Sequence, residues 1–111
     1  MKKRTLAQTL KVLSDPTRLS VFDVLMEGVQ CNCEIAERLG LSLSLISHHL
    51  RILRQAGLIQ SERDLQDARW VYYSVNRKVL VELNQAVDHL LNVDRIQSRA
   101  PSRGPKKCDQ C

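Results

Sequence analysis

The chain has 111 residues, 43% of them hydrophobic and 26% charged, which allows one compact globular domain with an ordinary core. The net charge of +5 favours an anionic partner. No apolar run approaches the roughly 18 residues of a membrane span, and Gln8 and Lys11 interrupt the apolar stretch that a signal peptide needs. We therefore expect a cytoplasmic protein with no membrane partner.

Two helices are predicted at the start of the chain. Leucines at positions 6, 10 and 13 recur at helical spacing and predict a helix over residues 3–13. A second helix is expected over residues 16–27, because Asp15 can cap it, Pro16 suits its first position and Gly28 can end it. Its inward-facing side chains are expected to be Leu19, Phe22, Leu25 and Met26.

Residues 42–57, SLSLISHHLRILRQAG, are typical of the recognition helix of a helix-turn-helix. A short helix over residues 32–39, a break at Gly40 and a cap at Ser42 precede it with the right spacing. Ile46, Leu50 and Leu53 form a core-facing stripe, next to which His49 is expected to pack. The opposite face carries short or hydrogen-bonding side chains that suit a DNA groove. The DNA contacts expected from it are Ser44, Ser47, His48 and Arg51.

After Gly57 the hydrophobic period changes from 3.6 to 2 residues. Residues 58–63 and 69–75 are typical of β-strands, and the polar residues 64–68 between them indicate a hairpin. A hairpin beside a recognition helix is the wing of a winged helix. Arg63 and Arg69 flank the loop and are placed to reach DNA, although both are also compatible with solvated charges at a sheet edge.

The last predicted helix covers residues 77–93, is capped by Asn76 and carries an apolar stripe. The stripe suits a two-fold dimer, which would place two recognition helices about one DNA turn apart; it also suits a monomer that folds the stripe onto its own core. From Asp94 onward the composition is too polar to form a core. We expect a mainly α, dimeric winged helix-turn-helix with a β-hairpin over residues 1–94, and a flexible basic tail over residues 95–111.

Four cysteines in a reducing compartment are more typical of metal or redox chemistry than of disulfides. Cys31 and Cys33 can converge if the first precedes the third helix and the second lies in its first turn. There the helix dipole is expected to lower the thiol pKa. Cys108 and Cys111 form a Cys-x-x-Cys chelate. The coil from Asp94 to Cys108 has a root-mean-square span of about 20 Å, so this pair can reach the site of Cys31 and Cys33. Alternatively, the pair can act as a separate scavenging or redox-active dithiol.

Four segments together resemble the ArsR/SmtB family of bacterial metal-sensing repressors: LSDPTRL at residues 13–19, CNCEIA at 31–36, the stretch 42–57, and DARWVYY at 67–73. The resemblance implies a homodimer, built from the first and last helices, that binds an inverted-repeat operator in double-stranded DNA. It also implies that a bound ion weakens DNA binding and so derepresses resistance genes.

The resemblance further implies that Cys31 and Cys33 are the paired thiols of the arsenic, cadmium and lead sensors. Ala36 stands where the arsenic sensor of enteric bacteria has a third cysteine, so the missing ligands fall to Cys108 and Cys111. The family's zinc site on the last helix is not expected, because Asp88 and His89 are adjacent and their side chains diverge.

Thiolate ligands select soft ions. Three thiolates suit As(III) or Sb(III), which we take as the expected inducer, and also Pb(II), whereas four suit Cd(II) or Zn(II). A metal-independent thiol redox switch is the alternative from a different class. An enzyme is not expected, because no histidine is tied to a cysteine by position.

Overall fold

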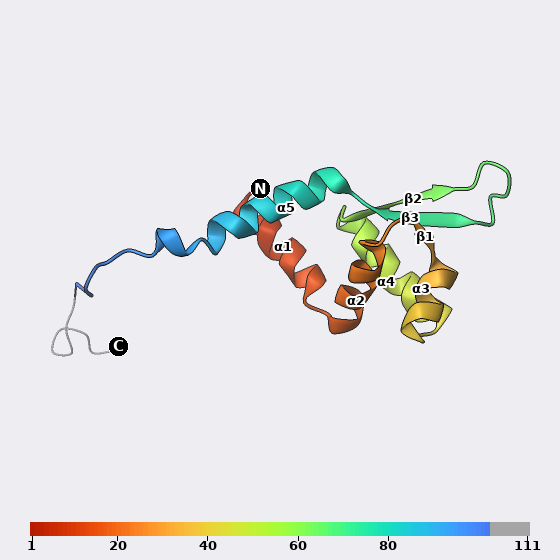
Figure 1. The fold of residues 1–111 in the computed structure, drawn as a ribbon, viewed down its shortest axis with the longest axis horizontal. Coiled ribbons are helices and arrows are strands. Elements are labelled where there is room, and N and C mark those ends of the chain that lie inside the picture. Colours follow the sequence, from red (N-terminus) through yellow and green to blue (C-terminus); the bar gives the residue numbers. More distant parts are fainter. Residues whose placement is uncertain (103–111) are drawn as a thin grey trace.

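The structure is a computed structural model that describes residues 1–102 (Figure 1). Within this range five α-helices are accompanied by a small antiparallel sheet with strand order β1-β3-β2, whose hairpin extends from one end of the helical body (Figure 1). The helices are α1 (Lys3–Leu13), α2 (Pro16–Leu25), α3 (Asn32–Leu39), α4 (Leu43–Gln55) and α5 (Arg77–Leu90), followed by the short 3-10 helix η1 (Val93–Arg95). The strands are β1 (Gln30–Cys31), β2 (Ile59–Arg63) and β3 (Val71–Val75). The winged helix-turn-helix predicted from the sequence is confirmed.

The predicted helix caps are present. Asp15 Oδ1 accepts the backbone N–H of Arg18 at 2.9 Å, and Pro16 is the first residue of α2. Ser42 Oγ accepts the N–H of Leu45 at 3.1 Å, and Gly40 ends α3 in a left-handed conformation with φ of 64°. Such a φ is easy for glycine alone, so the turn between the two helices depends on it.

The sheet contains one strand that the sequence did not predict. β2 and β3 form the expected hairpin, in register from Ile59 opposite Val75 to Arg63 opposite Val71. β1 lies on the other edge of β3, where Cys31 is opposite Tyr72. A two-residue strand shows no periodicity, which is why the sequence pattern missed it. Its consequence is that the start of α3 is joined directly to the hairpin.

The core lies where α2, α3, α4 and the sheet meet. Val21, Ile35 and Ile46 are fully buried at its centre. The prediction that Leu19 and Met26 face inward is wrong, since they are 50% and 54% exposed. α2 carries apolar side chains on several sides, so their spacing alone could not predict which side is buried. The helix also ends at Leu25, two residues before the predicted end at residue 27.

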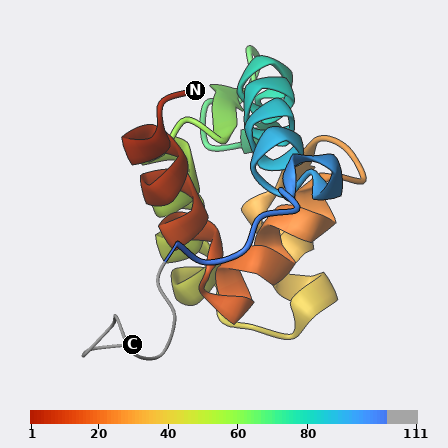
Figure 2. The ribbon, with the colours of Figure 1, turned by 90° about the vertical axis from the view of Figure 1, so that its left-hand side faces the viewer.

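α1 and α5 lie toward the end of the molecule opposite the hairpin loop (Figure 1), and Figure 2 shows that the two helices stand apart from each other. α5 ends at Leu90, three residues before the predicted end at Val93. Leu83 of its apolar stripe is buried, but Leu90 and Leu91 are exposed, as is Leu10 on α1. Part of the stripe is therefore left uncovered within the described chain. No helix among residues 1–102 is long and apolar enough to cross a membrane.

Candidate nucleic-acid interface and thiol site

The outer face of α4 carries the four side chains predicted to contact DNA. Ser44, His48 and Arg51 are exposed, and Ser47 is half-buried. Their spacings of three and four residues place them on one side of the helix, opposite the buried core stripe. Arg51 Nη2 lies 3.2 Å from His48 Nδ1. The structure thus brings these four residues together on a surface that hydrogen-bonding groups dominate.

His49 is buried beneath this face, as predicted. Its Nδ1 has no hydrogen-bond partner among residues 1–102. Burial lowers the pKa of His49 below its ordinary value, and the positive charges of Arg18 and His48 act in the same direction, against the attraction of Asp15. The recognition helix therefore packs against the start of α2 through an imidazole that resists protonation.

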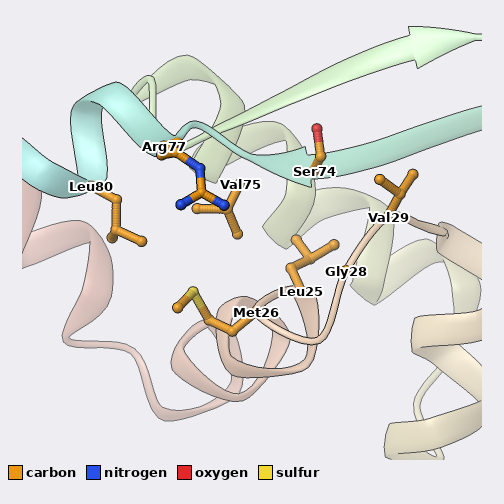
Figure 3. A pocket seen from close by; sticks show the side chains of 8 residues that line it. All are labelled: Leu25, Met26, Gly28, Val29, Ser74, Val75, Arg77 and Leu80. Atoms are coloured by element: carbon orange, nitrogen blue, oxygen red, sulfur yellow. The ribbon is translucent and has the colours of Figure 1, made fainter.

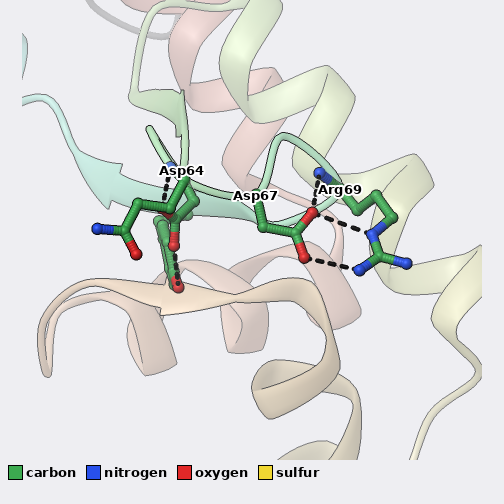
Figure 4. A network of polar contacts seen from close by, with 5 residues as sticks. Asp64, Asp67 and Arg69 are labelled. Atoms are coloured by element: carbon green, nitrogen blue, oxygen red, sulfur yellow. Dashed lines mark hydrogen bonds and ion pairs between the residues drawn. The ribbon is translucent and has the colours of Figure 1, made fainter.

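The hairpin loop is organised by its own carboxylates (Figure 4). Asp64 accepts the N–H of Gln66 at 2.9 Å, and Asp67 accepts the N–H of Arg69 at 3.1 Å. The Arg69 guanidinium also pairs with the Asp67 carboxylate at 2.8 Å, which raises the pKa of Arg69 and lowers that of Asp67. These contacts give the loop a defined shape.

Arg63 and Arg69 thus have contacts inside the wing. Arg63 Nη1 donates to the carbonyl of Ala68 at 2.7 Å, and the Arg69 side chain remains 87% exposed although it is paired with Asp67. Two acidic side chains in the same loop offset the two positive charges. The DNA contacts expected from Arg63 and Arg69 stay predictions, and both residues also shape the loop.

The thiol pair has the predicted placement. Cys31 ends β1 and is the N-cap of α3, and Cys33 is the second residue of that helix. Cys31 is only 4% exposed, whereas Cys33 is exposed. Glu34 accepts the N–H of Cys31 at 3.3 Å, which completes one half of a capping box. Neither cysteine forms a disulfide with another described residue.

The expected lowering of the thiol pKa is wrong for Cys31. Burial raises the pKa of this thiol, and the Glu34 carboxylate adds to the increase, although the backbone N–H of Glu34 opposes it. Loss of hydration outweighs the helix N-terminus here because the sulfur lies inside the protein. The raised pKa favours the protonated thiol of Cys31, and a thiol loses its proton when it binds a metal.

Within residues 1–102 no group of three histidine, cysteine or acidic side chains is arranged to hold a metal. The described part of the chain therefore supplies two thiols at this place. Cys108 and Cys111 lie outside the described residues. On α5, Asp88 and His89 are both exposed and belong to no such group.

Two hydrogen bonds between distant residues join the thiol region to the two elements that are predicted to contact DNA. Asn32, which lies between the two cysteines, donates from Nδ2 to Ser47 Oγ on α4 at 3.4 Å. Tyr72, opposite Cys31 in the sheet, donates from its hydroxyl to Asp64 in the hairpin loop at 3.4 Å. The sequence contains no local pattern for either contact, because each pairs residues that only the fold brings together.

A cavity of about 260 Å³ opens between the end of α2, strand β3 and the start of α5 (Figure 3). Leu25, Met26, Val75 and Leu80 supply aliphatic walls, and the Arg77 guanidinium also lines the cavity. None of the described thiol or predicted DNA-contacting residues lines it. The cavity is therefore separate from the site described above.

Residues 15–61 match the family model described as bacterial regulatory protein, arsR family. The transcriptional repressor SdpR of Bacillus subtilis (strain 168) is 40% identical over 82 residues, which cover 74% of this chain and 84% of SdpR. The chain belongs to the ArsR/SmtB family. The arsenical resistance operon repressor of Staphylococcus xylosus is 32% identical, with 86% of this chain and 88% of that protein covered.

The fold agrees with this assignment to the ArsR/SmtB family. The ArsR-like transcriptional regulator from Rhodococcus sp. RHA1 superposes with a TM-score of 0.68 at 26% identity, covering 78% of this chain and 79% of that one. As a family member, the chain is a DNA-binding transcriptional repressor, and these three relatives are regulators rather than enzymes.

Proposed function

We propose that this repressor binds operator DNA as a homodimer and releases it when a thiophilic ion binds Cys31 and Cys33. The observation that carries the proposal is the position of the thiol pair: it starts α3, and α3 packs directly against the recognition helix α4. An ion that draws the start of α3 toward itself therefore acts on the helix that carries the DNA-facing side chains.

The DNA side of the proposal rests on α4 and the hairpin. Ser44, Ser47, His48 and Arg51 would contact base edges and phosphates in the major groove, as the recognition helix of a helix-turn-helix does. Arg63 and Arg69 would reach the flanking backbone or minor groove from the wing. Two such units in a dimer would meet the two halves of an inverted repeat.

The dimer is proposed to form through α1 and α5. Leu10 on α1 and Leu90 on α5 are exposed, together with Leu91, Val93 and Ile96 beyond the helix end. A second copy of the chain would cover this apolar surface by two-fold symmetry.

Two cysteine thiolates do not complete a site for the proposed ions, so we assign the remaining ligands to Cys108 and Cys111. The pair in the described chain consists of one buried and one exposed thiol. With a third thiolate the site would take As(III) or Sb(III), the inducer that we favour, and with a fourth it would take Cd(II) or Zn(II); Pb(II) also suits three. Each thiol gives up its proton on binding.

The test is an anaerobic titration of the reduced protein with arsenite, Cd(II) and Zn(II), following thiolate–metal absorbance and the number of free thiols lost. We expect three thiols lost to arsenite, and weaker binding in Cys108→Ser/Cys111→Ser. Four thiols lost to Cd(II), with weak arsenite binding, would assign the protein to the divalent-metal sensors. Absence of metal binding at micromolar concentrations, together with DNA release by peroxide, would replace the proposal with a thiol redox switch.

A further inference from the structure

Asn32 is neither one of the proposed ion ligands nor one of the proposed DNA contacts, but it makes a hydrogen bond between the two regions. It is the first residue of α3 and lies between Cys31 and Cys33 in the chain. Its side-chain amide donates to Ser47 Oγ, fifteen residues away, at 3.4 Å. Among residues 1–102 this is the one hydrogen bond that joins α3 to α4.

The two helices also pack against each other through apolar side chains. Ile35 of α3 and Ile46 of α4 are fully buried in the shared core. Apolar packing sets the distance between helices but is non-directional, so it permits small rotations. A hydrogen bond has a required direction, and this one fixes how the start of α3 is turned relative to α4.

Ser47 belongs to the DNA-facing side of α4. It lies three residues after Ser44 and four before Arg51, so the three share one face. Ser47 is half-buried while Ser44 and Arg51 are exposed. The bond from Asn32 therefore ends on the inner margin of the surface that is proposed to bind DNA.

An ion shared by Cys31 and Cys33 would compete with this bond if binding turns the residues between the two thiols. In the structure the first cysteine is buried and the second exposed, whereas thiolate ligands of one metal lie about 2.3 Å from it. A turn of the segment 31–33 would bring the buried and the exposed sulfur to one ion. Asn32 is the middle residue of that segment, so the same turn draws its amide away from Ser47.

We infer that the Asn32–Ser47 hydrogen bond couples the thiol pair to the recognition helix: it holds α4 in the DNA-binding orientation and breaks when an ion occupies Cys31 and Cys33. Asn32 is thus a positioning residue, and the inference rests on the proposed ion-released repressor. By reciprocal linkage, loss of the bond weakens DNA binding by the ion-free protein and strengthens ion binding.

The measured quantity is the ratio of the DNA dissociation constants with and without the ion. The experiment uses the full-length dimer and a DNA duplex that the wild-type protein selects from a random pool. The ion is arsenite or Cd(II). Asn32→Ala and Ser47→Ala are each expected to lower the ratio roughly 3- to 10-fold, the range that one neutral hydrogen bond supports. The double variant should lower it no further, because both changes remove the same bond.

Two variants serve as matched controls. Ser47→Thr keeps the hydroxyl and should keep the wild-type ratio, while Glu37→Ala changes an exposed side chain on α3 that has no hydrogen bond within the described chain. Circular dichroism verifies folding, and Ser47→Thr against Ser47→Ala still tests the bond if Asn32→Ala does not fold. The inference is overturned if wild type releases DNA and Asn32→Ala or Ser47→Ala keeps the same ratio. If wild type loses no thiols and releases no DNA, the proposed function itself has failed.

Discussion

Side chains that are close together in the sequence of this repressor differ in whether they are buried or exposed. His48 and His49 are adjacent, yet one is exposed on the face of α4 that is proposed to bind DNA and the other is buried with an unpartnered Nδ1 within the described chain. Cys31 and Cys33 differ in the same way, one buried and one exposed. At this scale a residue's chemistry follows from which side of its helix it occupies.

His49 should make stability depend on pH. Its folded pKa lies below the ordinary value near 6.5, so in acid the unfolded chain takes up a proton that the folded protein resists. The free energy of unfolding should therefore fall as the pH decreases below about 6.5. Denaturant unfolding at several pH values measures this.

His49→Gln should show a smaller decrease over the same range. His89→Gln, which removes an exposed imidazole from α5, is the matched control. An undiminished acid decrease in His49→Gln would show that another group is responsible.

Arg51→Ala should weaken DNA binding by about 1–3 kcal/mol. The salt dependence of the association constant should also become shallower, by about 0.9 in the log–log slope if one phosphate contact is lost. Fluorescence anisotropy at several salt concentrations gives both values. The number of ions bound per protomer should not change, since Arg51 lies on α4 and the thiols start α3. An equal loss of ion binding contradicts this division of roles.

Among the elements, α4 is connected to α2, α3 and the sheet. Ser42 caps its start, and its inner stripe packs on α2 and α3. Near its end, Arg54 donates to Ser61 Oγ of β2 at 3.2 Å. β1 adds a connection that runs from Cys31 through Tyr72 to Asp64 in the hairpin loop. The start of α3 is therefore in contact with both elements proposed to bind DNA.

Ser42→Ala should destabilise the protein by about 1 kcal/mol, because the backbone N–H of Leu45 loses its acceptor at the start of α4. Chemical denaturation gives the change in the free energy of unfolding. Ser44→Ala is the matched control on the same helix: its side chain is exposed and caps nothing, so only a few tenths of a kcal/mol are expected. Equal losses in the two variants would argue against the cap.

At the scale of the whole molecule, apolar side chains are exposed on α1 and α5 as well as on the hairpin loop, where Leu65 and Trp70 lie. Leu10 on α1 and Leu90 on α5 are exposed, and α1 and α5 stand apart in Figure 2. The single chain leaves these side chains in water, which costs free energy in proportion to their apolar area. A second copy that covers them would also set the spacing between two recognition helices.

Leu10→Glu/Leu90→Glu should convert the proposed dimer to a monomer, because a charge placed in an apolar interface is not compensated. Sedimentation velocity measures the change in mass. DNA affinity should fall with it, since a monomer can occupy only one half-site. Leu65→Glu, at a fully exposed position of the hairpin loop, is the control and should stay dimeric. A doubly substituted protein that remains a dimer would place the interface elsewhere.

Local patterns in the sequence predicted most of the elements. The helices could be predicted from helical spacing and from residues that start or end a helix, because each of these signals acts within a few residues. These residues are Asp15, Pro16, Gly40, Ser42 and Asn76. The position of Cys31 before α3 and Cys33 within its first turn followed for the same reason. The recognition helix and the hairpin could be told apart because the spacing of hydrophobic residues changes from 3.6 to 2 after Gly57.

Tertiary structure decided whatever depends on contacts between distant residues. It buried Val21 in place of Leu19, paired Cys31 with Tyr72, and brought Asn32 to Ser47. It also raised the pKa of Cys31, where position at a helix start predicted the opposite, because hydration is lost only when the rest of the chain closes over the sulfur. Burial and long-range hydrogen bonds are properties of the packed molecule, and no local pattern contains them.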